Sequence, residues 1–206
     1  KGKIIKQNVG NDISKDNFKV CFSQFIENRE KILIKGTKTF KNNPTGFKIF
    51  QDWIEEKRDK SVPVRITMEA TGVYYEQLAF YLHEQTDYHL SIILPNMSKA
   101  YAKSLNLKTK TDKVDAKMLA QMGLERNLKQ WAPISEYSRM LKSLTRERLR
   151  LIHHKTMADN QLHALKHSYQ PHIETLKRIK NQINHLKELI LQVEVEIKEL
   201  IKADET

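Results

Sequence analysis

NVGNDISKDNFKVCFSQF (residues 8–25) contains two strand-forming segments joined by a short polar turn. In its second half, FKVCFSQF (18–25), apolar and polar residues alternate, which is typical of a strand with one buried face. The first half, NVGNDIS (8–14), is a shorter strand candidate, and KILIKGTKTF (31–40) repeats the alternation. Three consecutive strands with short connections predict an antiparallel meander.

Helices and strands alternate beyond this meander. Helices are predicted over 42–57, 71–85, 98–105 and 111–125, and strands over 63–70 and 89–95. This order predicts an α/β fold in which helices flank a mixed sheet. Pro133 indicates the end of this part, so we expect a first domain over 1–135.

The remaining residues, 136–206, contain no glycine and are predicted to form an all-α arm. Its two helices, over 136–168 and 172–202, would reverse at Tyr169-Gln170-Pro171 to give a helical hairpin or coiled coil. The second helix has a heptad seam of Leu176, Ile179, Ile183, Leu186, Ile190, Val193, Ile197 and Leu200. The seam either packs against the first helix or joins two copies of the chain in a homodimer or higher oligomer.

Charge and cysteine content narrow the classes of partner and location. The chain has 36 Lys and Arg residues against 25 Asp and Glu, a net charge of +11, which points to a polyanion such as nucleic acid or an anionic membrane surface. A single cysteine excludes an intramolecular disulfide and favours a cytoplasmic location. No run of about 18 apolar residues exists, so we expect no segment that spans a membrane.

Four acidic residues occupy positions from which their carboxylates could converge. Asp12 lies in the first predicted strand, where aspartate is uncommon, and Glu69 ends an apolar, β-branched strand. Asp112 and Asp115 are three residues apart at a helix start, which places both on one face. If that helix end lies beside the sheet, four carboxylates would repel one another unless cations bind, and oxygen ligands suit Mg²⁺. Two such ions would assist phosphodiester chemistry.

Each acid also has a structural explanation. Asp112 suits a helix N-cap, and Asp115 suits the first turn, where the helix dipole favours a negative charge. Glu69 suits a solvated strand end, and Asp12 suits a turn before Lys15. Only their joint occurrence, in this order of strands and helices, makes a metal site competitive with these alternatives.

Three segments, VGNDISKDNFKV (9–20), MEATGVYYEQLAFYL (68–82) and LKTKTDKVDAKMLA (107–120), resemble the acidic motifs of the DEDD transposases. These are the IS-one-ten insertion-sequence recombinases, which include Piv-type DNA invertases and bridge-RNA-guided recombinases. The resemblance covers about residues 7–135 and implies a RuvC-like, ribonuclease H-type fold. By position, the family's catalytic and metal-binding tetrad falls on Asp12, Glu69, Asp112 and Asp115. The resemblance also implies Mg²⁺, a structured guide (bridge) RNA, and donor and target DNA in a prokaryotic cytoplasm.

The sequence departs from the family pattern in two respects. Asn11 stands before the first Asp, where an apolar residue is usual. The family also has a C-terminal domain whose catalytic serine bonds covalently to DNA, whereas this sequence stops at Thr206, just after the arm. We therefore expect an N-terminal part without strand-exchange activity of its own. The alternatives are a guide-RNA-binding and dimerisation module, or an autonomous ribonuclease H-type nuclease or junction resolvase.

Basic residues gather next to the acidic motifs and along the first arm helix. We expect nucleic-acid phosphates to bind Lys99, Lys103, Lys108, Lys110, Lys113, Lys117, Arg139, Lys142, Arg146, Arg148, Arg150 and Lys155. A solvated charged face is the alternative explanation of such a run. The density of positive charge, with few acids opposite it, favours phosphate contact.

Overall fold

A computed structural model of the 206-residue chain describes residues 2–27, 32–106 and 112–204. The chain divides into two compact units, Lys1–Pro133 and Ile134–Thr206. The elements of the first unit are β1 (Ile4–Ile13), β2 (Asn17–Ile26), β3 (Leu33–Lys41), α1 (Pro44–Lys57), β4 (Val64–Glu69), α2 (Glu76–Gln85), β5 (His89–Ile93), α3 (Pro95–Ser104) and α4 (Asp112–Glu125). The second unit contains α5 (Glu136–Lys166) and α6 (Ile173–Asp204).

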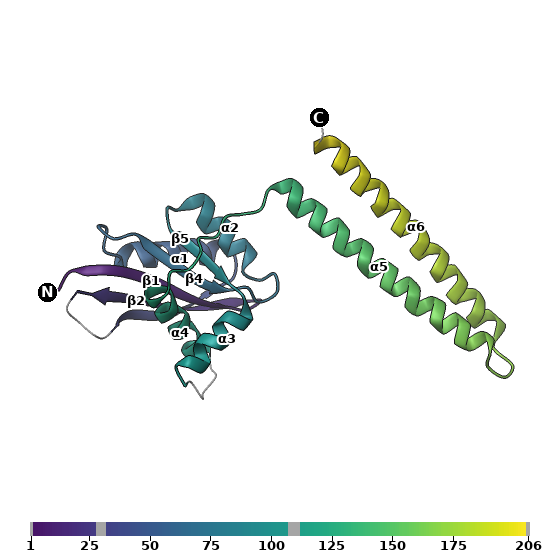
Figure 1. Ribbon diagram of the computed structural model, residues 1–206, viewed down its shortest axis with the longest axis horizontal. Helices are drawn as coiled ribbons and strands as arrows, with labels where there is room; N and C mark the ends of the chain where they lie inside the picture. Colours follow the sequence, from purple (N-terminus) through teal and green to yellow (C-terminus); the bar gives the residue numbers. More distant parts are fainter. Residues whose placement is uncertain (1, 28–31, 107–111, 205–206) are drawn as a thin grey trace. The chain divides into compact units, whose positions relative to one another are not determined.

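One five-stranded sheet, in the order β3-β2-β1-β4-β5, forms the centre of the first unit (Figure 1). β1, β2 and β3 pair antiparallel, which confirms the expected meander, and β4 and β5 continue the sheet parallel to β1. The expected α/β class, a mixed sheet with flanking helices followed by a helical part, is confirmed. The strand order agrees with the RuvC-like, ribonuclease H-type fold that the resemblance implies.

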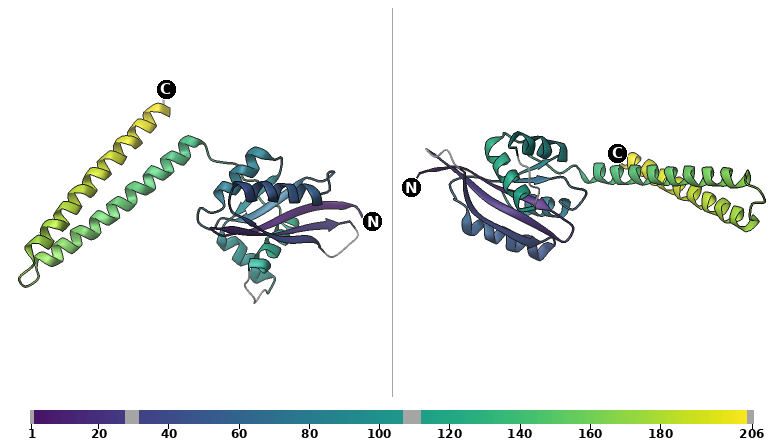
Figure 2. Two further views of the ribbon diagram at one scale, coloured as in Figure 1. Left: turned by 180° about the vertical axis from the view of Figure 1, so that it is seen from behind. Right: turned by 90° about the horizontal axis from the view of Figure 1, so that it is seen from below.

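The main hydrophobic core lies on the face of the sheet that α1 and α2 cover. Its centre is an aromatic cluster in which Phe18 of β2 packs edge-on against Phe50 of α1, with ring centroids 5.2 Å apart. On the opposite face, α4 lies against β1 and β2, and Figure 2 shows α1 and α4 on opposite sides of the sheet. Ala116 and Ala120 of α4 pack on Cys21 of β2 there.

Several elements differ in extent from the prediction: α3 begins at Pro95, three residues before its expected start, and the differences are largest at β1 and α2. β1 begins at Ile4, four residues before the expected start, and α2 begins at Glu76, five residues after it. Gly72 has a φ of 59°, a left-handed conformation that a helix does not contain, so residues 72–75 form a turn instead.

The second unit is a hairpin of α5 and α6 whose apolar seam packs inside the chain. Ile179 and Ile183 of α6 are buried with Ala158 of α5, and Leu162 and Leu165 pack beside them. Of the predicted seam, Ile179, Ile183, Leu186 and Val193 are buried, and Leu176, Ile190, Ile197 and Leu200 are half-buried. In the described ranges, no helix combines the length and the apolar character needed to cross a bilayer.

Candidate active site

Asp12 and Glu69 lie next to each other at the ends of two parallel strands. The paired residues of β1 and β4 end at Asn11 opposite Met68, and Asp12 and Glu69 are the next residue on each strand. Neighbouring strands are about 4.8 Å apart. Both carboxylates are half-buried, which weakens the screening of their charges by water.

Strand alternation turns both carboxylates toward the face that α4 covers. Gly10 and Thr67, two residues earlier on the same strands, both lie against residues of α4. Because side chains two apart on a strand share a face, Asp12 and Glu69 belong to the α4 face. The opposite face carries the main apolar core.

The helix α4 packs closely against β1 because β1 has a glycine, Gly10, at the point of contact. A Cβ atom on Gly10 would lie 2.1 Å from the Ala120 nitrogen and 2.2 Å from the Ala116 oxygen, so only glycine fits. Further back on β1, Asn8 donates to the Ala120 carbonyl at 2.9 Å and lies against Gly123. The helix therefore runs antiparallel to β1, and its N-terminal end points toward the ends of the two strands.

Asp112 and Asp115 occupy that N-terminal end. Asp112 begins α4, one turn before Ala116, and its side chain lies outside the described part of the structure. Asp115 is half-buried. Among the described side chains, no three of the His, Cys, Asp and Glu residues form a group that could hold a metal ion. The described pair at the centre of the site is Asp12 and Glu69.

Hydrogen bonds hold both oxygens of the Glu69 carboxylate. The buried hydroxyl of Ser98, on α3, donates to Oε2, and Thr71 donates to Oε1 at 3.2 Å. Ser98 is absent from the residues predicted for the site, because in the sequence it is only a serine near a helix start. Its role depends on the position of α3 beside the end of β4, which no local pattern reveals.

Cys21 lies on the same face, and its burial disfavours a role as a nucleophile. Burial raises the pKa of its thiol, and the hydrogen bond with Ser23 and the charge of Lys117 only partly oppose this. A thiol with a raised pKa remains protonated and unreactive at neutral pH. The chemistry of this face therefore depends on its carboxylates.

The basic residues near the acidic edge are exposed where the structure describes them. Lys99 and Lys103 extend from α3, and Lys117 extends from α4. Lys108 and Lys110 lie outside the described residues, as does the side chain of Lys113.

The basic residues of α5 divide between two faces of that helix. Arg139, Lys142, Arg146 and Arg150 follow one another at spacings of three and four, which places them on one exposed face. We call these four residues the α5 basic stripe.

Arg148 and Lys155 lie apart from this stripe and have partners within the hairpin. Arg148 donates to the Glu194 carboxylate of α6 from Nη2 at 2.7 Å, and Lys155 pairs with Asp159 at 2.8 Å. These two cations therefore serve contacts within the arm.

Comparison with known proteins supports the resemblance seen in the sequence. The family of DEDD transposases of the IS110 type, described as "Transposase", matches residues 9–171. Two curated relatives, the pilin gene-inverting proteins of Moraxella bovis and Moraxella lacunata, are each 37% identical over 152 residues. The matched region is 73% of this chain and 43% of each relative, so the chain spans less than half of their length.

Similar solved structures include a RuvC protein and a viral resolvase. The Thermus thermophilus RuvC structure has a TM-score of 0.46 at 10% identity, covering 61% of this chain and 100% of that one. The Fowlpox virus resolvase, in complex with Holliday junction DNA, has a TM-score of 0.41 at 11% identity, covering 60% and 100%. The family match over residues 9–171 is independent of these structures: the chain belongs to the DEDD transposase family of the IS110 type.

Proposed function

We propose that this chain is the carboxylate-bearing, N-terminal part of an insertion-sequence transposase that recombines DNA with Mg²⁺. The observation that carries the proposal is the adjacency of Asp12 and Glu69 on the face toward which the N-terminal end of α4 points. In this proposal Asp112 and Asp115 complete the set of four carboxylates. The family membership and the names of the pilin gene-inverting relatives support DNA rearrangement as the activity.

The donor set fits a divalent cation. Two carboxylates that extend from neighbouring strands on one face repel each other, and a doubly charged ion between them removes that repulsion. Carboxylate oxygens are the ligands that Mg²⁺ prefers, and Mg²⁺ supplies activation of an attacking oxygen and stabilisation of a leaving oxygen. Asp12 would bind from a rigid central strand, and Glu69 would keep its orientation through Ser98 and Thr71.

Nucleic acid is the partner that the surface charge supports. Lys99, Lys103 and Lys117 flank the carboxylates, and the α5 basic stripe offers four cations on one face. Cations at this density bind phosphates of DNA or of a structured guide RNA without reading a sequence. We place RNA on the α5 basic stripe and the DNA backbone at the carboxylates.

Self-association through the arm is part of the proposal. The seam of α6 is used mainly inside the hairpin, but Leu191 and Val195 leave a second apolar strip on the outside of α6, 61% and 52% exposed. Residues four apart share a helix face, so this strip is continuous. A second copy of the arm would cover it.

Mg²⁺ titration tests the carboxylate site. At ten times its dissociation constant a ligand stabilises the folded state by about 1.4 kcal/mol, a shift of roughly 3–6 °C in a domain of this size. We expect Mg²⁺ to raise the melting temperature of the parent chain. Asp12→Asn should abolish the Mg²⁺ increment, because it removes one of the carboxylate ligands.

Asp87→Asn is the matched control, because Asp87 is exposed and lies outside the site. It should keep the full Mg²⁺ increment. The absence of any Mg²⁺ shift in the parent chain would contradict the proposal. Mg²⁺-dependent nicking of DNA by this chain alone, abolished in Asp12→Asn, would instead identify an autonomous nuclease.

A further inference from the structure

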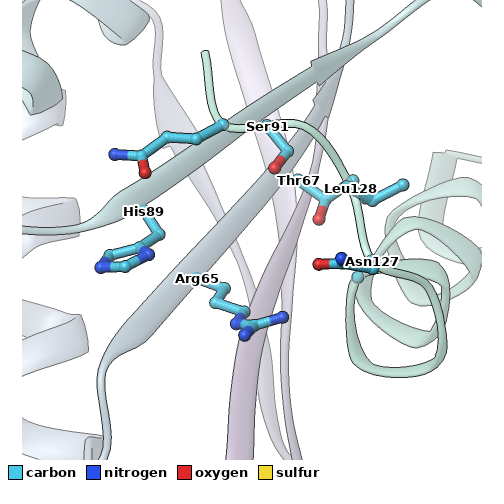
Figure 3. Close-up of a pocket in the computed structure, with 8 residues that line it drawn as sticks. Arg65, Thr67, His89, Ser91, Asn127 and Leu128 are labelled. Atoms are coloured by element: carbon cyan, nitrogen blue, oxygen red, sulfur yellow. The ribbon is translucent and has the colours of Figure 1, made fainter. Parts of the chain in front are cut away.

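A polar hollow lies on the α4 face of the sheet, near the opposite end of β4 and β5 from the carboxylates. Its volume is about 220 Å³. Figure 3 shows the polar ends of Arg65, Thr67, Ser91 and Asn127 gathered around it, with the His89 ring at its side. Four of these residues come from the sheet, and Asn127 comes from the segment that follows α4.

The pairing of β4 with β5 brings the polar side chains of the hollow together. Arg65 pairs with His89 and Thr67 pairs with Ser91 across the parallel strands, so two polar pairs stand on one face. Glu69 lies four residues beyond Arg65 in the same row, about 13 Å further along the strand. The hollow is therefore a second position, separate from the carboxylate edge.

The polar groups of the hollow are left without protein partners. Across the described part of the chain, the side chains of Arg65, His89, Ser91 and Asn127 make no hydrogen bond or ion pair with other protein groups. Thr67 is the exception, because its hydroxyl donates to Asn8 at 3.2 Å. The Arg65 guanidinium is half-buried and has no protein counterion in the described ranges, so its donors are available to a bound anion.

The side chains that line the hollow favour the binding of an anion. Its lining contains Arg65 and His89 and no carboxylate. Lys6 adds a further positive charge nearby, where its Nζ donates to the Leu124 carbonyl at 3.2 Å. A guanidinium offers a planar fork of donors that matches two oxygens of a phosphate, and hydroxyl and amide donors complete such a site.

We propose that this hollow binds a phosphate group, and that the phosphate belongs to the backbone of bound nucleic acid. Its volume is below the roughly 300–1,000 Å³ of sites for drug-sized ligands and suits a phosphate with part of its sugar. A second hollow shares Asn127 and has apolar lining from Met97 and Met122. A polar site beside an apolar one matches a nucleotide, which is ionic at its phosphate and apolar on the faces of its base.

The choice of nucleic acid as the source of the phosphate rests on the proposed function, whereas the phosphate site itself does not. Inorganic phosphate is therefore the first probe, exchanged for chloride at constant ionic strength while the melting temperature of the 206-residue chain is followed. Binding of a labelled single-stranded oligonucleotide, followed by fluorescence anisotropy, is the second.

Arg65→Gln is the test variant, because it replaces the charged guanidinium with an uncharged amide that can still donate a hydrogen bond. It should weaken phosphate and oligonucleotide binding about ten-fold, the effect of removing one charge-assisted hydrogen bond. Arg65→Lys should recover only part of the affinity, because lysine lacks the fork. Arg178→Gln, the same change on the exposed surface of α6, should have no effect.

The two probes separate the possible results. Loss of both affinities in Arg65→Gln supports a backbone-phosphate site. Loss of the inorganic phosphate effect alone supports a phosphate site that serves a free phosphate or a phosphate monoester. Equal affinities of the parent chain and a folded Arg65→Gln variant for both probes would overturn the proposal. The Mg²⁺ increment should survive Arg65→Gln, so failure here is distinct from failure at the carboxylates.

Discussion

Ser98 of α3 donates a hydrogen bond from its buried hydroxyl to Oε2 of Glu69 at the end of β4. Thr71 holds the other oxygen of the same carboxylate. Glu69 therefore has a fixed orientation before any cation arrives, and a carboxylate fixed in this way loses less conformational entropy when it binds a metal ion. Ser98 acts as a positioning residue in the proposed site.

Ser98→Ala should weaken Mg²⁺ binding about 10-fold, the lower end of the range for loss of an outer-shell partner. The readout is the Mg²⁺ concentration at which half of the melting-temperature increment is reached. Ser104→Ala is the control, because Ser104 lies on the same helix and donates to the Tyr101 carbonyl. Equal midpoints for the two variants would show that Ser98 does not position Glu69.

Two buried asparagines on β1 should respond oppositely to the same substitution. Asn11 is fully buried, and neither its amide nitrogen nor its amide oxygen has a hydrogen-bond partner. Asn8 is also fully buried, but its amide donates to α4 and its oxygen accepts from Thr67. The position before Asp12 therefore carries an uncompensated polar group in the core.

Asn11→Val should raise the free energy of unfolding by about 1–3 kcal/mol, because it removes a buried amide that has no partner. Asn8→Val should lower it by a similar amount, because it leaves polar groups of its neighbours unpaired. Urea denaturation curves measure both. A destabilised Asn11→Val variant would mean that the Asn11 amide has a partner in solution.

Gly10→Ala should move or unfold α4, because the added Cβ would overlap the backbone of the helix at Ala116 and Ala120. We expect a decrease in the free energy of unfolding of about 3 kcal/mol and a reduced Mg²⁺ increment, since the helix end that carries Asp112 and Asp115 would shift. Gly36→Ala is the control: its Cβ would meet a side-chain atom of Trp53 at 3.2 Å, which can adjust. Circular dichroism and thermal melting compare the two.

Local periodicity was sufficient to predict the order of strands and helices, because alternation and helical spacing are properties of short segments. It missed the start of β1, where Gln7 is polar and yet fully buried. The side-chain amide of Gln7 donates to the Asp59 carbonyl at 2.9 Å and to the Val62 carbonyl at 2.6 Å. The burial of Gln7 depends on a loop more than 50 residues away in the sequence, and a local hydrophobic pattern contains no information about that contact.

The candidate site was predictable only in part for the same reason. The sequence placed Asp12 and Glu69 near the ends of predicted strands, and the family resemblance supplied the full set of four carboxylates. The roles of Ser98 and Arg65 depend on contacts between elements that are remote in sequence. The run of cations on α5 also contains two different faces, since Arg148 pairs with Glu194 across the hairpin and the α5 basic stripe lies on an exposed face.

The α5 basic stripe should dominate the salt dependence of RNA binding. Replacing Arg146 and Arg150 with Ala should weaken binding and reduce the slope of log affinity against log salt by about 2, roughly one unit for each phosphate that the protein no longer neutralises. Arg148→Ala should leave the slope unchanged, because that guanidinium is held by Glu194. Filter binding from low to moderate salt measures the slopes, and identical slopes in all variants would place the RNA elsewhere.

Two substitutions on α6 should separate folding of the arm from self-association. Ile183 is 5% exposed and packs in the cluster with Ala158, so Ile183→Glu buries an unpaired charge and should unfold the hairpin, lowering helical circular dichroism. Leu191 is 61% exposed, so Leu191→Glu should leave the helix content unchanged. If the outer strip joins two copies, Leu191→Glu should also shift the mass in light scattering toward the monomer.

Lys198→Glu is the control for Leu191→Glu, because it places the same acidic side chain at an exposed position that is already polar. It should change neither the mass nor the helix content. A parent chain that is monomeric at all concentrations, or a Leu191→Glu variant of unchanged mass, would confine the apolar residues of α6 to packing within one chain. Mass and helicity together are needed, because a mass change accompanied by reduced helicity would report unfolding of the hairpin rather than a broken interface.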